Sequence, residues 1–299
     1  MIQRLRFYQI PWSHYCDKVR WALDLKEIPY ELINYNLFGK TTGLERAPKT
    51  MPKLMPMLED PNNKDDNQFQ YDSTPILVYL DTQYPRSSVS LFPSSSEQRE
   101  QMIDTCLRLD SSLGLYVRRI AYVQILKESP HILSLVLLHR IREEQVREKT
   151  EEILLEIGNH LRTNDYLVGN QFSASDLTFC SLVKLLIRVP CFYDDRRFQI
   201  IFDYHERIRR NYDPKYLNID NDLEKNIDKH RIQIKKNEKN LTTRLKTFIH
   251  QINIVQRIFI MIMTMIVKNT YEPKTDDDIP QFKTSSSQDK QEKQAINDP

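Results

Sequence analysis

Glycine is scarce in this sequence, and its placement does not match the common phosphate-binding loops. Only five glycines occur among the 299 residues. None falls in the G-x-x-x-x-G-K-[S/T] pattern of a P-loop or in the G-x-G-x-x-G pattern of a dinucleotide-binding turn. Because those loops use glycine to bring the backbone close to phosphate groups, the sequence disfavours nucleotide-dependent chemistry.

The sequence also lacks an excess of charge of one sign and a cluster of cysteines. Its 43 basic and 41 acidic residues give a formal net charge of +2, so we expect no nucleic-acid partner. The first ten residues contain no apolar stretch of signal-peptide length. The four cysteines are far apart, at Cys16, Cys106, Cys180 and Cys191. We therefore expect free thiols, a cytoplasmic protein and no metal cofactor.

Residues 1–85 show the pattern of a thioredoxin-like domain. The predicted elements are, in order, a strand, a helix, a strand, the two strands of a hairpin and a helix, at residues 5–9, 15–25, 30–34, 53–59, 69–71 and 74–81. A polar turn at 61–67 favours antiparallel pairing of the hairpin strands. Asp72 or Ser73 can cap the last helix. This order, βαβ and then ββα, is that of a thioredoxin-like domain.

The chain then changes to helical periodicity. A linker rich in serine and proline, residues 86–97, leads into an all-helical domain at 98–218. Its helices are predicted at 98–128, 135–161, 175–188 and 198–211. The third is strongly apolar, so we place it at the centre of a bundle. The predicted fold class is therefore α+β, with a thioredoxin-like domain followed by an all-α helical domain.

The C-terminal part has little capacity to form a core. Residues 219–270 are predicted to form a helical extension and residues 271–299 a disordered tail. Residues 252–267 contain an apolar run, but its most apolar part, 258–267, would span only about 15 Å as a helix. That is half of the hydrocarbon thickness, so we expect no clean transmembrane helix. An interfacial helix or weak membrane tether is the alternative.

Four short motifs follow one another as they do in a known family. Residues 11–23 (PWSHYCDKVRWAL) resemble the first strand-to-helix turn of soluble glutathione transferases, and residues 55–58 (MPML) resemble their Val-Pro-x-Leu segment. Residues 71–73 (YDS) resemble the family's Glu/Asp-Ser turn, and residues 169–176 (GNQFSASD) resemble the start of its central helix. The active-site turn is similar to that of the serine-type theta and zeta classes.

This resemblance implies that Ser13 is the catalytic residue and that glutathione is a co-substrate. The Ser13 hydroxyl would donate a hydrogen bond to the glutathione sulfur and favour its thiolate form. The helix that starts there adds unpaired N–H groups and a positive dipole end, which stabilise an anion. On the residue alone, Ser13 can also be only the N-cap of the helix.

Ionisation of the thiol explains only part of such a reaction. A thiol with a pKa of about 8.5 is about 3% ionised at pH 7, and lowering the pKa by about two units makes it mostly thiolate. Part of this gain is lost because nucleophilicity falls with the pKa. The electrophile must therefore be held against the sulfur, and we expect Tyr116, Arg119 and Tyr122 of the second domain to line its pocket.

The Met55–Pro56 step is the expected partner of the cysteinyl part of glutathione. By resemblance, Pro56 would be in cis, and the backbone of Met55 would pair with the ligand as an added strand. Pro52, in the similar Met51–Pro52 pair, is the alternative.

The two ends of glutathione also have expected partners. Asp72 and Ser73 would hold the charged end of the γ-glutamyl group at the start of a helix, although they can equally serve as simple caps. Lys53 is a candidate partner for the glycine carboxylate, as is Lys40.

Cys16 is a possible secondary thiol. It stands at the second position of a Cys-x-x-Cys pattern whose first position is Ser13, so disulfide exchange of the glutaredoxin type would lack one sulfur. Alternatively, Cys16 is a small buried residue of the helix.

Ser173 and Asp176 have a structural role in our interpretation. They form the pattern of a capping box with aspartate in the place of glutamate. We assign no catalysis to them.

The sequence leaves three functional hypotheses. The first is a detoxifying glutathione transferase that conjugates the thiolate to a hydrophobic electrophile. The second is a non-catalytic module of the same fold that contacts other proteins, with or without a membrane tether through residues 252–267. The third is a glutathione-dependent reductase or isomerase. The resemblance also implies a homodimer.

Overall fold

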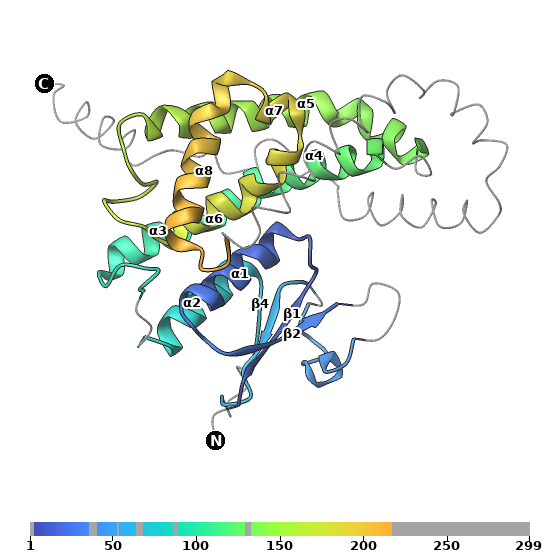
Figure 1. The fold of residues 1–299 in the computed structure, drawn as a ribbon. Helices are drawn as coiled ribbons and strands as arrows, with labels where there is room; N and C mark the ends of the chain where they lie inside the picture. The colour runs from blue at the N-terminus through green and yellow to red at the C-terminus, as the bar shows by residue number, and fades with distance from the viewer. Residues whose placement is uncertain are drawn as a thin grey trace, which may run out of the picture.

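The chain forms a sheet domain and a helical domain that pack against each other (Figure 1). The computed structural model describes residues 3–35, 41–52, 54–63, 68–85, 89–128 and 133–216, without the side chains of residues 122–123 and 125–143. Helices α1 and α2 lie between the sheet and the helical domain (Figure 1). The predicted extension 219–270, with the apolar run 252–267 inside it, and the predicted tail 271–299 lie outside the described residues.

The sheet has four strands in the order β2-β1-β3-β4. The strands are β1 (Leu5–Gln9), β2 (Tyr30–Asn34), β3 (Met57–Glu59) and β4 (Phe69–Tyr71). β1 pairs in parallel with β2 and antiparallel with β3, and β3 pairs antiparallel with β4. This confirms the predicted βαβ unit and hairpin.

One predicted strand is shorter than expected. The sequence pattern predicts a strand at 53–59, whereas β3 includes only the last three residues of that range. The peptide bond between Met55 and Pro56 is cis, as predicted, and Pro56 has no N–H group to donate to a neighbouring strand. The cis-proline turn therefore ends the ladder before it reaches Met55.

Alternation along the strands divides the sheet residues between two cores. Leu5, Phe7 and Leu58 belong to the main core, on the side of helices α1 (His14–Leu25) and α2 (Ser73–Gln83). Tyr8 and Met57 belong to a smaller cluster with Leu44, which lies in the short helix η1 (Leu44–Arg46). Both faces of the sheet are thus covered, which is why successive residues of β1 are buried.

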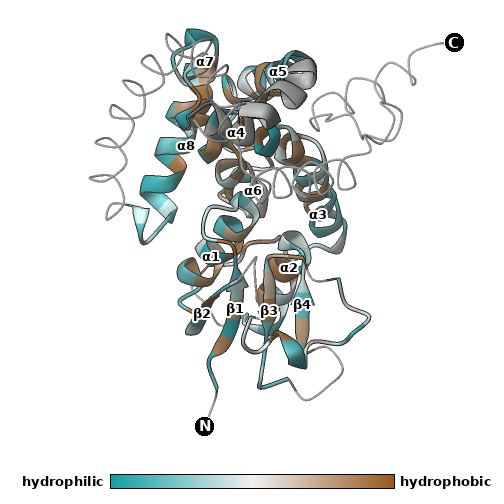
Figure 2. Cartoon of the chain, turned by 90° about the vertical axis from the view of Figure 1, so that its right-hand side faces the viewer, coloured by the Kyte–Doolittle hydropathy of each residue, from teal (hydrophilic) through white to brown (hydrophobic). Residues whose placement is uncertain are grey.

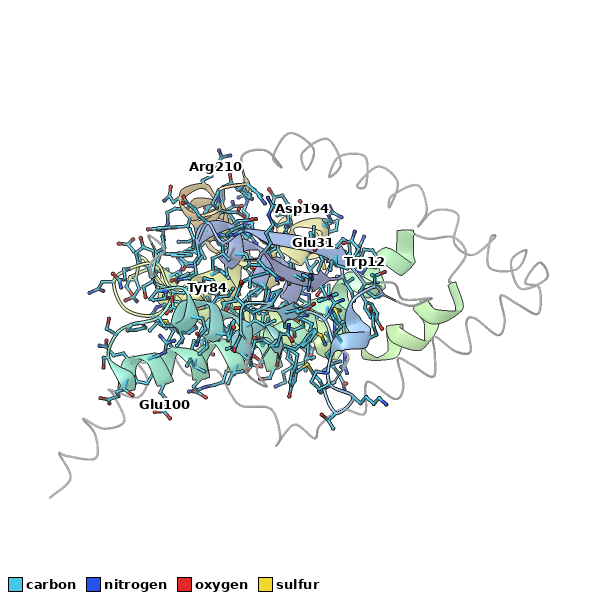
Figure 3. The ribbon with its side chains drawn as sticks, turned by 90° about the horizontal axis from the view of Figure 1, so that it is seen from below. Trp12, Glu31, Tyr84, Glu100, Asp194 and Arg210 are labelled. Atoms are coloured by element: carbon cyan, nitrogen blue, oxygen red, sulfur yellow. The ribbon has the colours of Figure 1, made fainter. Side chains whose placement is uncertain are left out.

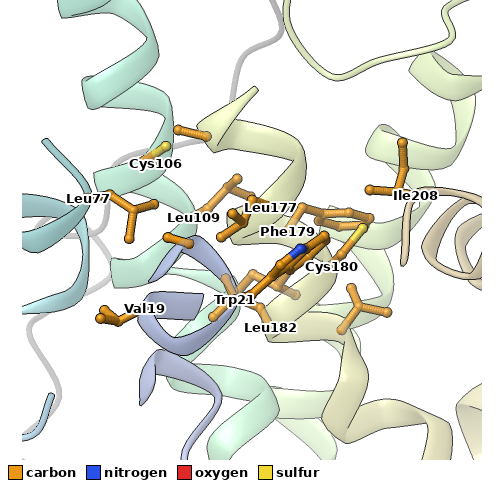
Figure 4. Close-up of a cluster of buried hydrophobic side chains, with 14 of the residues drawn as sticks. Val19, Trp21, Leu77, Cys106, Leu109, Leu177, Phe179, Cys180, Leu182 and Ile208 are labelled. Carbon is orange, nitrogen blue, oxygen red and sulfur yellow. The ribbon is translucent and has the colours of Figure 1, made fainter. Parts of the chain in front are cut away.

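The helical domain is built around α6. Its elements are α3 (Ser96–Ser111), α4 (Leu113–Glu128), α5 (Leu133–Leu161), α6 (Ala174–Val183), η2 (Lys184–Arg188), α7 (Pro190–Tyr193), η3 (Arg196–Phe198) and α8 (Gln199–Tyr212). Every residue of α6 is buried, as the apolar sequence predicts. Figure 4 shows its side chains meeting those of α1, α2 and α3 in one continuous cluster. Figure 2 shows α3 and α8 as largely hydrophilic on the sides turned to the viewer.

Two predicted helices are interrupted. The pattern at 98–128 predicts a single helix, but the helix is interrupted at Ser112, which separates α3 from α4. The Ser112 hydroxyl donates to the Arg108 carbonyl at 2.6 Å, which satisfies one of the last carbonyl groups of α3. The pattern at 175–188 also gave one helix, whereas α6 tightens into the 3-10 helix η2 after Val183.

Charged groups are buried where the two domains meet. Asp17 of α1 forms ion pairs with Arg209 of α8 and with Lys184 of η2, the latter at 2.7 Å. Arg209 lies over the Trp21 ring at 3.9 Å, and the Trp21 indole N–H donates to the Tyr212 carbonyl at 2.8 Å. Burial alone would raise the pKa of Asp17, but the adjacent cations lower it well below its ordinary value. These contacts fix α1 to the helical domain.

Candidate active site

Three segments that are far apart in the sequence meet at one edge of the sheet. Tyr8 of β1 pairs with Met57 of β3, and Met57 pairs with Tyr71 of β4. Because β3 is antiparallel to both neighbours, the ends of β1 and β4 lie beside the start of β3. The segment leading to Ser13, the Met55–Pro56 turn and the Asp72–Ser73 step therefore share this edge.

Ser13 is the N-cap of α1 and is half-buried. Its Oγ accepts a long hydrogen bond from the Cys16 N–H at 3.4 Å, and its own N–H donates to the Ile10 carbonyl at 3.0 Å. Capping uses a lone pair of the hydroxyl and not its proton. The two interpretations of Ser13, as a cap and as a donor to sulfur, are therefore compatible.

Cys16 lies in the core. Its side chain is fully buried, and Sγ accepts a hydrogen bond from the Ile10 N–H at 3.4 Å. Burial raises the pKa of this thiol, outweighing the hydrogen bonds that favour the thiolate. The structure therefore favours the interpretation of Cys16 as a buried helix residue over that of a secondary thiol.

The start of α2 is held in an unusual backbone conformation. Asp72 has φ 68° and ψ 143°, and its Oδ1 accepts from the Ser73 N–H at 2.6 Å. A positive φ is uncommon for a residue other than glycine, and such conformations concentrate at functional sites. Ser73 itself is completely buried, whereas Asp72 is exposed.

A buried carboxylate from the second domain reaches the start of α2. Oδ2 of Asp110, in α3, accepts from Lys18 Nζ at 2.8 Å, from Thr74 Oγ1 at 2.7 Å and from Ser73 Oγ at 3.3 Å. Lys18 Nζ also donates to Thr74 Oγ1 at 2.6 Å. Among the described residues, Asp110 Oδ1 is buried without a hydrogen-bond partner. This oxygen retains acceptor capacity that the described residues do not use.

Asp110 and Lys18 are functional-site residues that were not predicted from the sequence, although a signal was present. Lys18 precedes Val19, whose side chain faces the core, and it is completely buried. A lysine at such a position needs a partner of opposite charge. Asp110, an acidic residue of a later helix that follows the apolar positions Cys106 and Leu109, fits this requirement.

Helix α4 begins beside the Ser13 turn. The Tyr15 hydroxyl donates to the Asp110 carbonyl at 2.7 Å, and a Cβ on Gly114 would come within 2.5 Å of that hydroxyl. Of the predicted pocket residues, Tyr116 is partly buried against the core, and Arg119 is half-buried. The Tyr122 side chain lies outside the described residues.

His14 is a neutral neighbour of Ser13. Its imidazole is buried and hydrogen-bonded to the Gly114 backbone. Burial, followed by the charge of Arg118, lowers the pKa of His14 to about 3. The ring therefore carries no charge at neutral pH.

The remaining predictions concern two lysines, a capping box, metal ligands and a membrane-spanning helix. Lys53 and Lys40 lie outside the described residues. The Ser173–Asp176 capping box is present, and Asp176 Oδ2 accepts from the Ser173 N–H at 2.8 Å, which confirms the predicted structural role. The described part of the chain holds no group of three potential metal ligands and no helix long and apolar enough to cross a membrane.

Comparison with known proteins finds a family model that matches the first domain and solved structures that share the fold of both domains. Residues 7–88 match the model of the glutathione S-transferase N-terminal domain. Glutathione S-transferase 3 of Schizosaccharomyces pombe is 26% identical over 170 residues, which cover 54% of this chain and 66% of that relative. The chain thus spans just under two thirds of the relative's length.

Solved structures match over most of their own length. A glutathione transferase family member from Pseudomonas fluorescens Pf-5, with two glutathione molecules bound, matches with a TM-score of 0.56 at 15% identity, covering 72% of this chain and 91% of that one. Glutathione transferase F7 from Populus trichocarpa matches with a TM-score of 0.56 at 17% identity, covering 73% and 98%. The fold is that of glutathione transferases, and these matches do not distinguish the class.

Proposed function

We propose that this chain is a serine-type glutathione transferase that conjugates the glutathione thiolate to a hydrophobic electrophile. The observation that supports it best is the meeting of three segments at one sheet edge: the Ser13 N-cap, the cis Met55–Pro56 step and the start of α2 at Ser73. Each matches one part of glutathione: thiol, cysteinyl backbone and γ-glutamyl end. In this proposal the protein acts in the cytoplasm and as a homodimer.

The thiol is ionised at the start of α1. The Ser13 O–H donates to the sulfur, and the N–H groups of the first turn add their positive end. The thiol proton leaves to solvent, and the thiolate attacks the electrophilic carbon. The new S–C bond forms as the leaving group departs or as the attacked double bond or ring takes the electron pair.

The backbone of glutathione is held by the sheet edge and α2. Met55, which lies just before β3 at this edge of the sheet, offers its backbone to the cysteinyl unit. Ser73 donates to the α-carboxylate of the γ-glutamyl group. Asp110 Oδ1, which is buried and without a protein partner in the described part of the chain, accepts from the α-ammonium group.

The test separates the capping role of Ser13 from its role toward sulfur. Glutathione is titrated into the full chain, and the pKa of the bound thiol is followed by thiolate absorbance in wild type, Ser13→Thr and Ser13→Ala. Threonine keeps the hydroxyl and the cap, so the thiol pKa should stay depressed. Alanine should return it toward about 8.5 and lower turnover of an aromatic halide.

Each alternative has its own outcome. A folded wild-type chain that binds no glutathione would favour the non-catalytic module. If Ser13→Ala binds glutathione and the pKa of the bound thiol is the same as in wild type, the serine-type assignment is wrong. Turnover of disulfides or of isomerisable substrates, but not of electrophiles, would favour the reductase or isomerase.

A further inference from the structure

A buried carboxylate joins the short helix η1 to the face of the sheet turned away from α1 and α2. The Glu59 side chain, on β3, is 1% exposed and forms a bidentate pair with Arg46 of η1. Arg46 Nε lies 3.0 Å from Oε1, and Nη2 lies 2.8 Å from Oε2. The Tyr8 hydroxyl of β1 donates to the same carboxylate at 2.7 Å and accepts from Arg46 at 3.1 Å. Because bidentate pairs fix geometry as well as charge, Arg46 ties η1 to two strands.

The fit between η1 and the sheet is close. Gly43, directly before η1, has φ +97°, and a Cβ at this position would come within 2.7 Å of Arg46 Nη2 and 2.3 Å of the Tyr8 hydroxyl. Leu44, the first residue of η1, is buried in one cluster with Tyr8 and Met57. The polar pair and the apolar packing therefore hold η1 in the same place.

The same cluster reaches the step that is proposed to hold the cysteinyl backbone. Met55, on the N-terminal side of the cis peptide bond, is partly buried against the cluster that contains Leu44, and also against the main core. Pro56 and Met57 after it are buried. Because packed side chains transmit small displacements, a shift of η1 would reach Met55 through this cluster.

We infer that Arg46 is a positioning residue for glutathione: its pair with Glu59 fixes η1 and, through the packing of that helix, the Met55 backbone. The inference rests on the proposed function, which assigns the cysteinyl unit of glutathione to Met55. Arg46 acts here without contact to the ligand. Without the pair, glutathione would have to order this segment when it binds, and the cost would weaken binding. The chemical step at Ser13 would proceed as before once glutathione is bound.

Arg6 provides a matched control, because it donates to the same carboxylate from within the sheet. Its Nη1 lies 2.7 Å from Glu59 Oε1, and its side chain is 30% exposed, compared with 44% for Arg46. Arg6 also pairs at 3.7 Å with Glu31, which Figure 3 shows on the strands of the sheet. Replacing either arginine by methionine leaves Glu59 with the other, so we expect similar losses of stability. Only Arg46→Met also releases η1.

The test is a calorimetric titration of S-methylglutathione, which cannot form a disulfide, into the full chain. The proteins are wild type, Arg46→Met, Arg46→Lys and Arg6→Met. We expect Arg46→Met to raise the dissociation constant about tenfold and Arg6→Met to leave it within about twofold of wild type. Lysine keeps the charge but not the bidentate pair, so Arg46→Lys should lie between wild type and Arg46→Met. If Arg46→Met does not fold, Arg46→Lys carries the comparison with Arg6→Met.

Kinetics separates positioning from a merely structural role. In turnover of an aromatic halide, Arg46→Met should raise the KM for glutathione about tenfold and leave kcat within about twofold. A loss of folded protein alone would lower the apparent kcat and the binding stoichiometry, without changing KM or the dissociation constant. That result would overturn the inference.

Hydrogen exchange gives an independent readout of η1. Peptides that cover residues 41–52 should exchange faster in Arg46→Met than in wild type or Arg6→Met, and S-methylglutathione should restore part of the protection. Equal exchange in the two methionine variants would contradict the role of Arg46 in fixing η1.

The outcomes distinguish the two proposals. If folded wild type binds neither glutathione nor S-methylglutathione, the proposed function fails and the inference fails with it. If wild type binds, and Arg46→Met and Arg6→Met weaken binding equally, the charge around Glu59 matters and the position of η1 does not, so only the inference fails. Unchanged affinity in folded Arg46→Met would also overturn the inference alone.

Discussion

Lys18 Nζ lies 2.8 Å from Asp110 Oδ2, so the first helix of each domain supplies one member of a buried ion pair. Lys18 is fully buried, and the Asp110 side chain is 12% exposed. Removing one member of such a pair leaves a buried charge without compensation. The same carboxylate also accepts from Ser73 and Thr74, so the proposed γ-glutamyl subsite is completed by the packing of the two domains.

Replacing Ser73 by alanine should weaken glutathione binding more than it weakens the fold. Its hydroxyl is the proposed donor to a ligand carboxylate, whereas its bond to Asp110 is long at 3.3 Å. We expect the dissociation constant measured by calorimetry to rise about tenfold. Ser173→Ala is the matched control: it removes a capping box, should cost about 1 kcal/mol in urea unfolding and should leave glutathione affinity unchanged. Equal effects of the two variants on affinity would contradict the assignment of Ser73.

Replacing Arg209 by methionine should strongly destabilise the protein. Arg209 pairs with Asp17 and Asp213, and the Asp17 carboxylate is buried. We expect a loss of about 3 kcal/mol in the free energy of unfolding, measured with urea. Arg197→Met is the control, because Arg197 pairs with Glu151 at 3.0 Å and with Asp195 at 2.7 Å on the surface, where such pairs contribute little to stability. A similar loss in both variants would mean that burial of the Asp17 pair does not determine its contribution.

His14 should make the fold less stable in mild acid. Its pKa is about 3 in the folded chain and about 6.5 when unfolded, so between these values the unfolded state binds more protons. Stability should therefore fall as the pH drops below about 6.5, with this residue contributing about 2 kcal/mol of loss between pH 7 and pH 5. His14→Asn cannot titrate there, and its urea-unfolding free energy should vary correspondingly less with pH. The buried His205 has the same direction of shift and accounts for part of the dependence that remains.

Two glycines with positive φ should respond differently to alanine. Gly43 has φ +97°, and an added Cβ would come within 2.3 Å of the Tyr8 hydroxyl, whereas Gly169 has φ +70° and open space around it. Both substitutions carry the backbone cost of about 1–2 kcal/mol. Gly43→Ala should cost a further 1–3 kcal/mol or so, because the Tyr8 hydroxyl donates to the buried Glu59 carboxylate at 2.7 Å and would have to move. Thermal or urea unfolding measures the stability of both variants. Equal losses in the free energy of unfolding would show that the Tyr8 hydroxyl moves aside without an energetic cost.

Local patterns in the sequence predicted the strands and the capping of the helices. Strands β1, β2 and β4 occur at the predicted residues, because each is a short apolar or alternating run bounded by turns. The capping box at Ser173 was predicted because it depends on residues only three positions apart. The cis Met55–Pro56 bond was implied by the family motif and not by the residues alone.

Tertiary partners could not be predicted in the same way. Asp110 is 92 residues from Lys18, and no local rule relates the two. The break at Ser112 was missed because the helical periodicity continues across it. The candidate site was therefore predicted at the sheet edge with a pocket lined by second-domain residues, whereas the carboxylate of Asp110 was not predicted.

The buried charges at the domain boundary also restrict how the two domains can be exchanged. A first domain transplanted onto a helical domain that lacks counterparts of Arg209 and Asp110 would leave Asp17 and Lys18 without these partners. Because Lys184 also pairs with Asp17, a working chimaera would need these five residues to be transferred together, so these positions should be inherited as a unit even though the sheet and the helical bundle are recognisable as separate modules.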